Sequence, residues 1–358
     1  MFNDTISGRT ARTLAKTGRA RYRVAIATSL LVLMSGTTRA QEADFEKIKQ
    51  AAEREGKVVV YTSSIDYEMR PVKAAFEKMF PKVQFQSLRL PSATAFTRYM
   101  GERQAGAVQV DVLFTGSSAL FQQNPELFVP LTKARIPNLP SSPKIVPKND
   151  TYVVPQVSQH QVAYNTSLVS KDDLAKHLKS WKDLADPFWR GKVVLGDPKA
   201  TTTHMSWLKV MRDAYGDQWV RDFAKNEPAV VGSLVLGIQQ TAAGAYHIAV
   251  PAVPSQSIEL LAKGAPIANY RPEGPAHGNE TSMAVPKDAP HPNAGLLFIY
   301  WKLTPEAQTM LCGIGTVPTL PTTPGTDCPV LPANHIGSLD LIPPETEREI
   351  MTLLGRTP

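Results

Sequence analysis

Three threonines and a histidine, Thr201, Thr202, Thr203 and His204, stand between an apolar run and a segment with helical periodicity. A threonine at the start of a helix caps it, because its hydroxyl accepts a hydrogen bond from an unpaired amide of the first turn. One threonine is enough for that purpose. The other hydroxyls and the partial positive charge of a helix N-terminus favour an anionic group such as phosphate, phosphonate or carboxylate. The segment is therefore either an anion-binding helix start or a set of turn and cap residues, and His204 either donates to an anion or simply begins the helix.

Two more hydroxyl clusters follow apolar runs nearer the N-terminus. Ser63 and Ser64 come after the first run, and Thr115, Ser117 and Ser118 come after a later one. Serine and threonine are common in turns, so each of these residues taken singly has a structural explanation. The coincidence of three clusters at strand ends favours a shared role in ligand binding.

The elements that must position these clusters alternate between strand and helix. The apolar run 58–61 predicts a buried strand, 67–81 an amphipathic helix, 82–90 a strand, 94–106 a helix and 110–118 a strand. This order is typical of an open, mainly parallel α/β sheet. Such sheets bind ligands beyond the carboxyl ends of their strands.

A second α/β unit follows a proline-rich stretch over residues 125–155. Residues 180–198 predict a short helix, a turn and a strand, 204–226 predict one or two helices, and 245–253 predict another strand. A further helix is expected over 293–311. Because the prolines lie between periodic segments, they mark loops rather than disorder.

The first 40 residues have the pattern of a secretory signal peptide. A basic segment precedes an apolar run of 13 residues, and small residues, Thr38 and Ala40, occupy the usual cleavage positions. The run is shorter than the roughly 20 residues that a spanning helix needs. The leader holds seven arginines and lysines and one aspartate, so its net +6 accounts for most of the full-chain +7 and leaves +1. That balance gives no support for nucleic-acid binding, and we expect a free periplasmic protein.

Two cysteines occur in the chain, Cys312 and Cys328. We expect a disulfide between them, because an exported protein meets an oxidising compartment. They make a poor zinc site, since no other cysteine and no nearby histidine completes one.

The order of segments resembles the periplasmic solute-binding proteins of ABC importers, extracellular solute-binding family 1, in the group that contains ferric-ion, thiamine, polyamine and phosphonate binders. The segments that carry this resemblance are 56–64, 110–118, 162–169, 180–198 and 281–311. The resemblance implies a type II fold of two α/β lobes, each an open and mainly parallel sheet flanked by helices, that close by a hinge motion on a ligand held in the cleft between them.

The resemblance also implies boundaries and partners. Lobe one would comprise residues 41–160 and 275–325, lobe two residues 161–274, and the tail 326–358 is left unplaced. The expected partners are a small-molecule ligand and the permease and ATPase subunits of an ABC importer. We expect a monomer without a cofactor.

Four further ligand-binding candidates come from segments where the family places contacts. His160 and Tyr164 lie in the first crossing segment, Gln256 follows a lobe-two strand, and Glu280 lies in the returning segment, where it could meet a ligand amine. The alternatives are a buried histidine with satisfied hydrogen bonds at 160 and a solvated loop around 280.

One departure from the family bears on the ligand. Ferric-binding members carry adjacent tyrosines after the strand that ends near residue 253, whereas this chain has Ser255, Gln256 and Ser257 there. Ferric ion prefers anionic oxygen ligands, and these side chains are neutral. A small anionic or zwitterionic organic solute is therefore the leading expectation, ahead of ferric ion.

Two other hypotheses remain open. A metal could be captured by His160, His204, His247 or His277 with Glu280, although these residues lack the spacing of a metal motif. An exported hydrolase would need a triad assembled from distant residues such as Ser117, His160 and Asp197. The chain contains no G-x-S-x-G, H-E-x-x-H or P-loop motif, so no enzymatic activity is expected.

Overall fold

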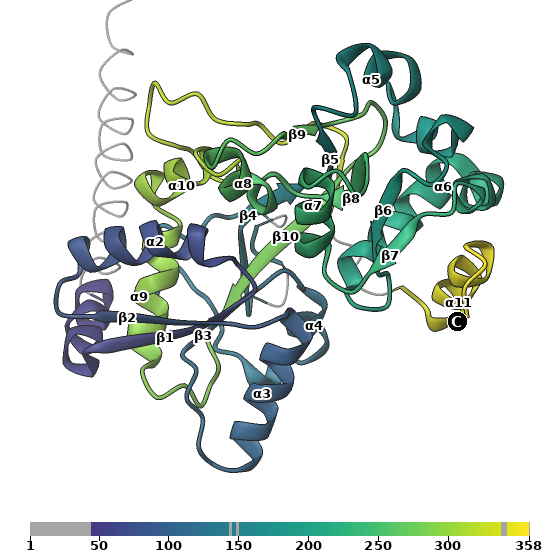
Figure 1. Cartoon of the computed structure of the whole chain (residues 1–358). Coiled ribbons are helices and arrows are strands. Elements are labelled where there is room, and N and C mark those ends of the chain that lie inside the picture. The colour runs from purple at the N-terminus through teal and green to yellow at the C-terminus, as the bar shows by residue number, and fades with distance from the viewer. Residues whose placement is uncertain (1–43, 143–144, 148–149, 338–341, 358) are drawn as a thin grey trace, which may run out of the picture.

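The computed structural model describes residues 44–142, 145–147, 150–337 and 342–357, and these fold into two β-sheets with helices packed against them (Figure 1). The expected α/β class is confirmed. The expected signal peptide over residues 1–40 lies outside the described residues. Within the described part of the chain, no helix has the length and apolar composition needed to cross a membrane.

The first sheet contains the strand–helix–strand series that the N-terminal periodicity predicts. Its strands lie in the order β11-β4-β10-β3-β1-β2, and β12 pairs with β10. β1, β2 and β3 are parallel, so their carboxyl ends lie at one edge, while β10 runs antiparallel to β3 and β4. The strands are β1 (Lys57–Thr62), β2 (Gln84–Arg89), β3 (Val112–Thr115), β4 (Val153–Gln159), β10 (Ala276–Ala284), β11 (Val317–Pro318) and β12 (His335–Ile336).

The second sheet has the order β7-β6-β8-β5-β9. Its centre is parallel, because β6 pairs in parallel with both β7 and β8, whereas β5 is antiparallel to β8 and β9. The strands are β5 (Gln161–Asn165), β6 (Val193–Gly196), β7 (Ala229–Val231), β8 (Ile248–Ala252) and β9 (Ile267–Tyr270).

Helices cover both sheets and bury their apolar sides. Phe76 of α2 packs edge-on against Phe298 and Trp301 of α9, with ring centroids 5.4 and 5.7 Å apart. The helices are α2 (Asp66–Met79), α3 (Ser92–Gln104), α4 (Ala119–Gln123), α5 (Lys171–His177), α6 (Thr202–Lys225), α7 (Leu234–Ala242), α8 (Ile258–Ala262), α9 (Pro292–Lys302), α10 (Pro305–Cys312), α11 (Pro344–Leu353) and an N-terminal helix described over 44–55, with 3₁₀ turns η1 (Pro125–Leu127), η2 (Trp181–Ala185), η3 (Pro187–Trp189) and η4 (Pro254–Gln256).

A kink divides the long helix α6, which accounts for the expectation of one or two helices there. Gly216 has φ +83° and ψ 171° inside α6. That backbone conformation is rarely open to residues with a Cβ, so glycine permits the helix to change direction. The two halves of α6 pack against the same core, since Trp207 before the kink lies 6.2 Å from Trp219 after it, measured between ring centroids.

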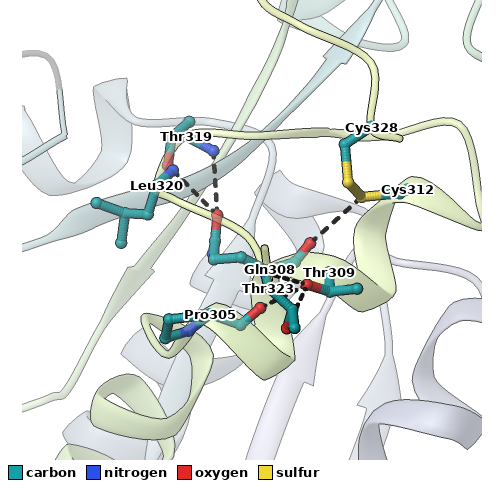
Figure 2. Close-up of a disulfide and its surroundings, with 8 residues drawn as sticks. All are labelled: Pro305, Gln308, Thr309, Cys312, Thr319, Leu320, Thr323 and Cys328. Atoms are coloured by element: carbon teal, nitrogen blue, oxygen red, sulfur yellow. Dashed lines mark hydrogen bonds between the residues drawn. A yellow bond between two sulfur atoms is a disulfide. The ribbon is translucent and has the colours of Figure 1, made fainter. Parts of the chain in front are cut away.

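The expected disulfide between Cys312 and Cys328 is present, with Cα atoms 4.9 Å apart (Figure 2). The loop that it closes is also held by Gln308, whose side-chain oxygen accepts hydrogen bonds from the amides of Thr319 and Leu320 at 3.1 Å each. Gln308 is fully buried. The disulfide and this buried amide together fix the proline-rich loop to the end of α10.

The C-terminal tail contacts both sheets. Its short strand β12 pairs with the start of β10, and α11 then packs against α6 (Figure 1). Ile350 and Met351 join the hydrophobic core of the second sheet, and Glu349 lies 2.9 Å from Arg212 of α6. The tail, which the sequence left unplaced, therefore spans from the first sheet to the second.

The hydrophobic core of the first sheet contains a buried lysine. Lys302 at the end of α9 is fully buried, and its ammonium has no hydrogen-bond partner among the described residues. Its Nζ atom lies 5.5 Å from the ring centroid of Phe114. Burial lowers the pKa of Lys302 to about 8, and Glu68 acts against that shift. A buried cation with so few partners costs stability.

Replacing Lys302 by methionine should raise the free energy of unfolding at pH 7 by about 2 kcal/mol, because the substitution removes a buried charge and keeps the volume. Because burial lowers the pKa of Lys302 from 10.5 to about 8, the penalty is full below pH 8, falls as the pH rises from 8 to 10.5 and is absent above that. Urea denaturation at pH 7 and pH 10 measures the difference. Lys78→Met, on the exposed end of α2, is the control, and a destabilised Lys302→Met protein would show that Lys302 is instead well paired.

Candidate functional site

The two sheets are joined at a narrow junction. β4 ends at Gln159 and β5 begins at Gln161, so one residue, His160, separates a strand of the first sheet from a strand of the second. The chain returns between β9 and β10, and the amide of His160 donates to the carbonyl of His277 at 2.9 Å. The two crossings are therefore hydrogen-bonded to each other.

The loops after β1 and β3 meet at the carboxyl edge of the first sheet, as expected for parallel neighbours. The amide of Gly116 donates to Ser63 Oγ at 3.1 Å, and the amide of Ser64 donates to Thr62 Oγ1 at 3.0 Å. A Cβ at position 116 would lie 2.5 Å from the side-chain nitrogen of Asn279. Glycine is required there because the Asn279 amide lies directly on the backbone.

Several side chains at this edge are buried without hydrogen-bond partners among the described residues. They include Thr115 Oγ1, Asn279 Oδ1, Gln159 Nε2 and His160 Nδ1. Ser117 is half-buried and Ser118 is buried at the start of α4. Orphaned polar groups cost stability and tend to be retained where they serve a function.

The threonine cluster divides between a cap and other roles. The amide of His204 donates to Thr201 Oγ1 at 3.3 Å, so Thr201 is the cap of α6. Thr202 is exposed and lines a cavity of about 390 Å³ whose opposite wall is α11. Thr203 is half-buried. Thr202 therefore lies across this cavity from the C-terminal helix α11.

His204 is a packed, buried histidine. Its ring lies against Gly196, where a Cβ would overlap it, and its Nδ1 is 3.2 Å from the carbonyl of Asp197. Burial lowers its pKa, while the Asp197 carbonyl opposes that shift. The imidazole is therefore neutral at pH 7.

His160 and His277 lie together in the junction, with ring centroids 5.0 Å apart and planes at 76°. His277 Nε2 is 2.9 Å from Ser206 Oγ, and its Nδ1 is 3.0 Å from the carbonyl of Ile336. Burial lowers the pKa of His277 to about 4 and that of His160 well below its usual value. No group of three or more histidine, cysteine, aspartate or glutamate side chains in the described residues is arranged to hold a metal ion.

Two candidate residues lie apart from the hydroxyl clusters. Glu280 Oε1 is 3.6 Å from His335 Nε2, beside the C-terminal segment that the disulfide anchors. Tyr164 of β5 pairs with Ile248 and Ala268 and packs against the core of the second sheet.

A groove of about 330 Å³ lies between elements of the two sheets, and Gln256 is the one candidate residue in its lining. The start of α2 and the end of β2 form one wall, and α7, η4 and α8 form the other. Its lining residues are Ile65, Asp66, Tyr67, Arg70, Arg89, Val235, Gln239, Gln256, Glu259, Leu260 and Lys263.

The groove carries more positive than negative charge. Arg70 and Arg89 have no ion pair and no side-chain hydrogen bond to any described residue, whereas Lys263 is 3.1 Å from Glu259 and neutralises it. Asp66 is the remaining carboxylate in the lining. Two unpaired guanidinium groups beside the N-terminus of α2 therefore face Gln256 across the groove.

Sequence reasoning missed these arginines, although a signal for one of them exists. Arg89 is the last residue of β2, and the rule that selected hydroxyl residues after β1 and β3 applies to β2 as well. Arg70 lies on a helical surface, where a charged residue is typical of solvent exposure and gives no such signal.

Comparison with known proteins places the chain among binding proteins. The family described as bacterial extracellular solute-binding protein matches residues 61–309. The iron-bound HitA of Pseudomonas aeruginosa is similar in structure, with a TM-score of 0.63 and 17% identity over 84% of this chain and 98% of that one. The substrate-binding protein of an ABC transporter from Agrobacterium tumefaciens has a TM-score of 0.69 and 13% identity over 84% and 93% of the two chains.

A third similar structure is the periplasmic binding protein AfuA of Actinobacillus pleuropneumoniae with fructose-6-phosphate bound. Its TM-score is 0.60, and its identity is 18% over 84% of this chain and 97% of that one. At these identities the likeness concerns the fold. The two-sheet chain has the type II periplasmic-binding-protein fold, as expected.

Gly196→Ala should lower the free energy of unfolding by about 1–3 kcal/mol, because the new methyl group overlaps the buried His204 ring. In a His204→Ala background the same change should cost little, since the methyl group then fills the vacated space. Chemical denaturation of the four proteins in this cycle measures the coupling. Equal costs in the two backgrounds would contradict the packed position of His204.

Proposed function

The chain belongs to the bacterial extracellular solute-binding protein family, and from this membership we propose that it captures a small anionic or zwitterionic organic solute for an ABC importer. The family implies a periplasmic location, a small-molecule ligand and an ABC permease as partner. We further propose that it acts as a monomer and that an ATPase subunit drives the importer. Family and fold are those of transport proteins rather than enzymes.

The observation that supports an anionic ligand is the net positive charge of the groove between α2 and α8. Arg70 and Arg89 are unpaired, and the α2 N-terminus adds partial positive charge next to them. Guanidinium groups bind carboxylates and phosphates through paired, charge-assisted hydrogen bonds. A groove of about 330 Å³ is at the small end of the sites that hold small molecules.

Hydroxyl and amide groups would complete the recognition. Ser63, Ser64, Ser117 and Thr203 are half-buried, and we propose that they face the ligand when the two lobes close. Lobe one would comprise residues 41–160 and 275–325 and lobe two residues 161–274, with the crossing at His160 as the hinge. Asp66 in the groove would pair with an amine if the ligand is a zwitterion.

Ferric ion is the weaker candidate for this chain, although HitA was solved with iron. Gln256 offers a neutral side chain at the groove, and its neighbours Ser255 and Ser257 are buried, whereas hard trivalent iron prefers anionic oxygen ligands. The fructose-6-phosphate in AfuA is an anionic solute on the same fold, and a phosphate ester of this kind suits two arginines.

Replacing both Arg70 and Arg89 by glutamine should weaken binding of the anionic ligand by a hundredfold or more, because each charge-assisted hydrogen bond contributes about 1.5–3 kcal/mol. Thermal shifts can be measured with a panel of fructose-6-phosphate, methylphosphonate, citrate, spermidine and ferric ion. The wild type should be stabilised by one of the anions, and the double variant should lose that shift.

A matched control replaces Arg54 and Arg135, which lie outside the groove, by glutamine. This control should keep the full thermal shift. A shift of the wild type with ferric ion or spermidine alone, or an unchanged shift in the Arg70→Gln/Arg89→Gln protein, would contradict the proposal.

A further inference from the structure

Four histidines gather at the junction of the two sheets, and each comes from a different segment. His160 connects β4 to β5, His204 lies in the first turn of α6, His277 lies in β10, and His335 lies in β12. We call these four the junction histidines. His160, His204 and His277 are buried, with 2–7% of their surface exposed, and the side chain of His335 is 8% exposed. Burial lowers the pKa of His160 most, and charges on the other three histidines lower it further.

The hydrogen bonds of His277 fix its neutral form. A carbonyl can only accept, so the Nδ1 atom, 3.0 Å from the carbonyl of Ile336, carries the ring proton. The Nε2 atom then has a free lone pair, which accepts a hydrogen bond from the Ser206 hydroxyl at 2.9 Å. One neutral ring thereby connects β10 to the tail and to α6 of the second sheet.

The groups around the junction provide little compensation for added positive charge. From β10, Glu280 faces His335 at 3.6 Å, and from the loop before α6 the Asp197 carbonyl faces His204 at 3.2 Å. The Glu280 and Asp197 carboxylates also oppose the lowering of the pKa of His277 and of His204, respectively, and the remaining groups that act on one another are the histidines themselves. A second proton bound in this region is therefore repelled by the charge of the first.

We propose that protonation of the buried junction histidines favours a looser arrangement of the two sheets, in which the Ser206–His277 contact between α6 and β10 is lost. A protonated His277 no longer accepts from the Ser206 hydroxyl, and the pair keeps a hydrogen bond only if the hydroxyl rotates so that Nε2–H donates to Ser206 Oγ. Its charge is also costly while the ring is buried and is relieved when water reaches it. The positioning of α6 against β10 thus depends on a neutral junction.

The sign and size of the effect follow from linkage. The pKa of His277 falls from 6.5 to about 4 through burial. The neutral, buried arrangement is fully favoured above pH 6.5 and loses its advantage as the pH falls toward 4. If His277 alone titrates, the loosened arrangement gains about tenfold in population between pH 7.5 and pH 5.5.

Small-angle X-ray scattering of the purified protein without ligand, from pH 7.5 to pH 4.5, tests this proposal. The radius of gyration should rise as the pH falls, with a midpoint between pH 4 and 6.5, while the far-ultraviolet circular dichroism stays constant. Because no ligand is involved, failure of this test leaves the proposed solute binding untouched, and failure of the binding test leaves this one standing.

Three variants separate the junction from other titrating groups. His277→Gln should abolish the pH-dependent change, and Ser206→Ala should show an increased radius already at pH 7.5 because it keeps the histidines but removes the contact. His247→Gln, a half-buried histidine outside the junction, should behave like the wild type. A constant radius in the wild type, or a pH-dependent change that persists in His277→Gln, would overturn the proposal.

Discussion

The crossing at His160 constrains the rest of the structure. β4 and β5 are separated by this one residue, and each is hydrogen-bonded into a different sheet, so the two sheets are held close together here. The returning strand β10 is bonded to the same crossing through the amide of His160. The carboxyl edge of the first sheet is thereby held beside α7, η4 and α8, and the groove with Arg70 and Arg89 lies between them.

Apolar packing lies mainly away from this crossing, and buried polar groups lie close to it. The large aromatic side chains are buried within the layers, such as Phe76 against α9 and Trp207 in α6. The junction instead holds buried polar atoms without partners, including Gln159 Nε2 and His160 Nδ1. Burial of apolar surface in the hydrophobic cores of the two sheets supplies the folding free energy that this polar region does not. Such a division is expected of a protein whose two halves must move relative to each other.

Local periodicity predicted β1, β2, β3, β6 and β8 and the helices α2, α3, α6 and α9, whereas strands such as β9 and β10, which pair with distant segments, were not predicted. The series from β1 to β3 was recognised because apolar runs alternate with amphipathic segments. The three-residue, half-buried strand β7 gave too short a pattern. For the site, the meeting of Ser63 with the loop at Gly116 followed from parallel strand ends. The position of Thr202 beside α11 could not be predicted, since it depends on where a tail more than 140 residues later in the chain packs.

The binding of an acidic group between α2 and α8 can be tested by a crystal structure of the protein isolated from the periplasm without refolding. We predict a small organic molecule whose acidic group lies within hydrogen-bond distance of Arg70 or Arg89. A metal ion held at the groove, or a ligand seated away from both arginines, would contradict it.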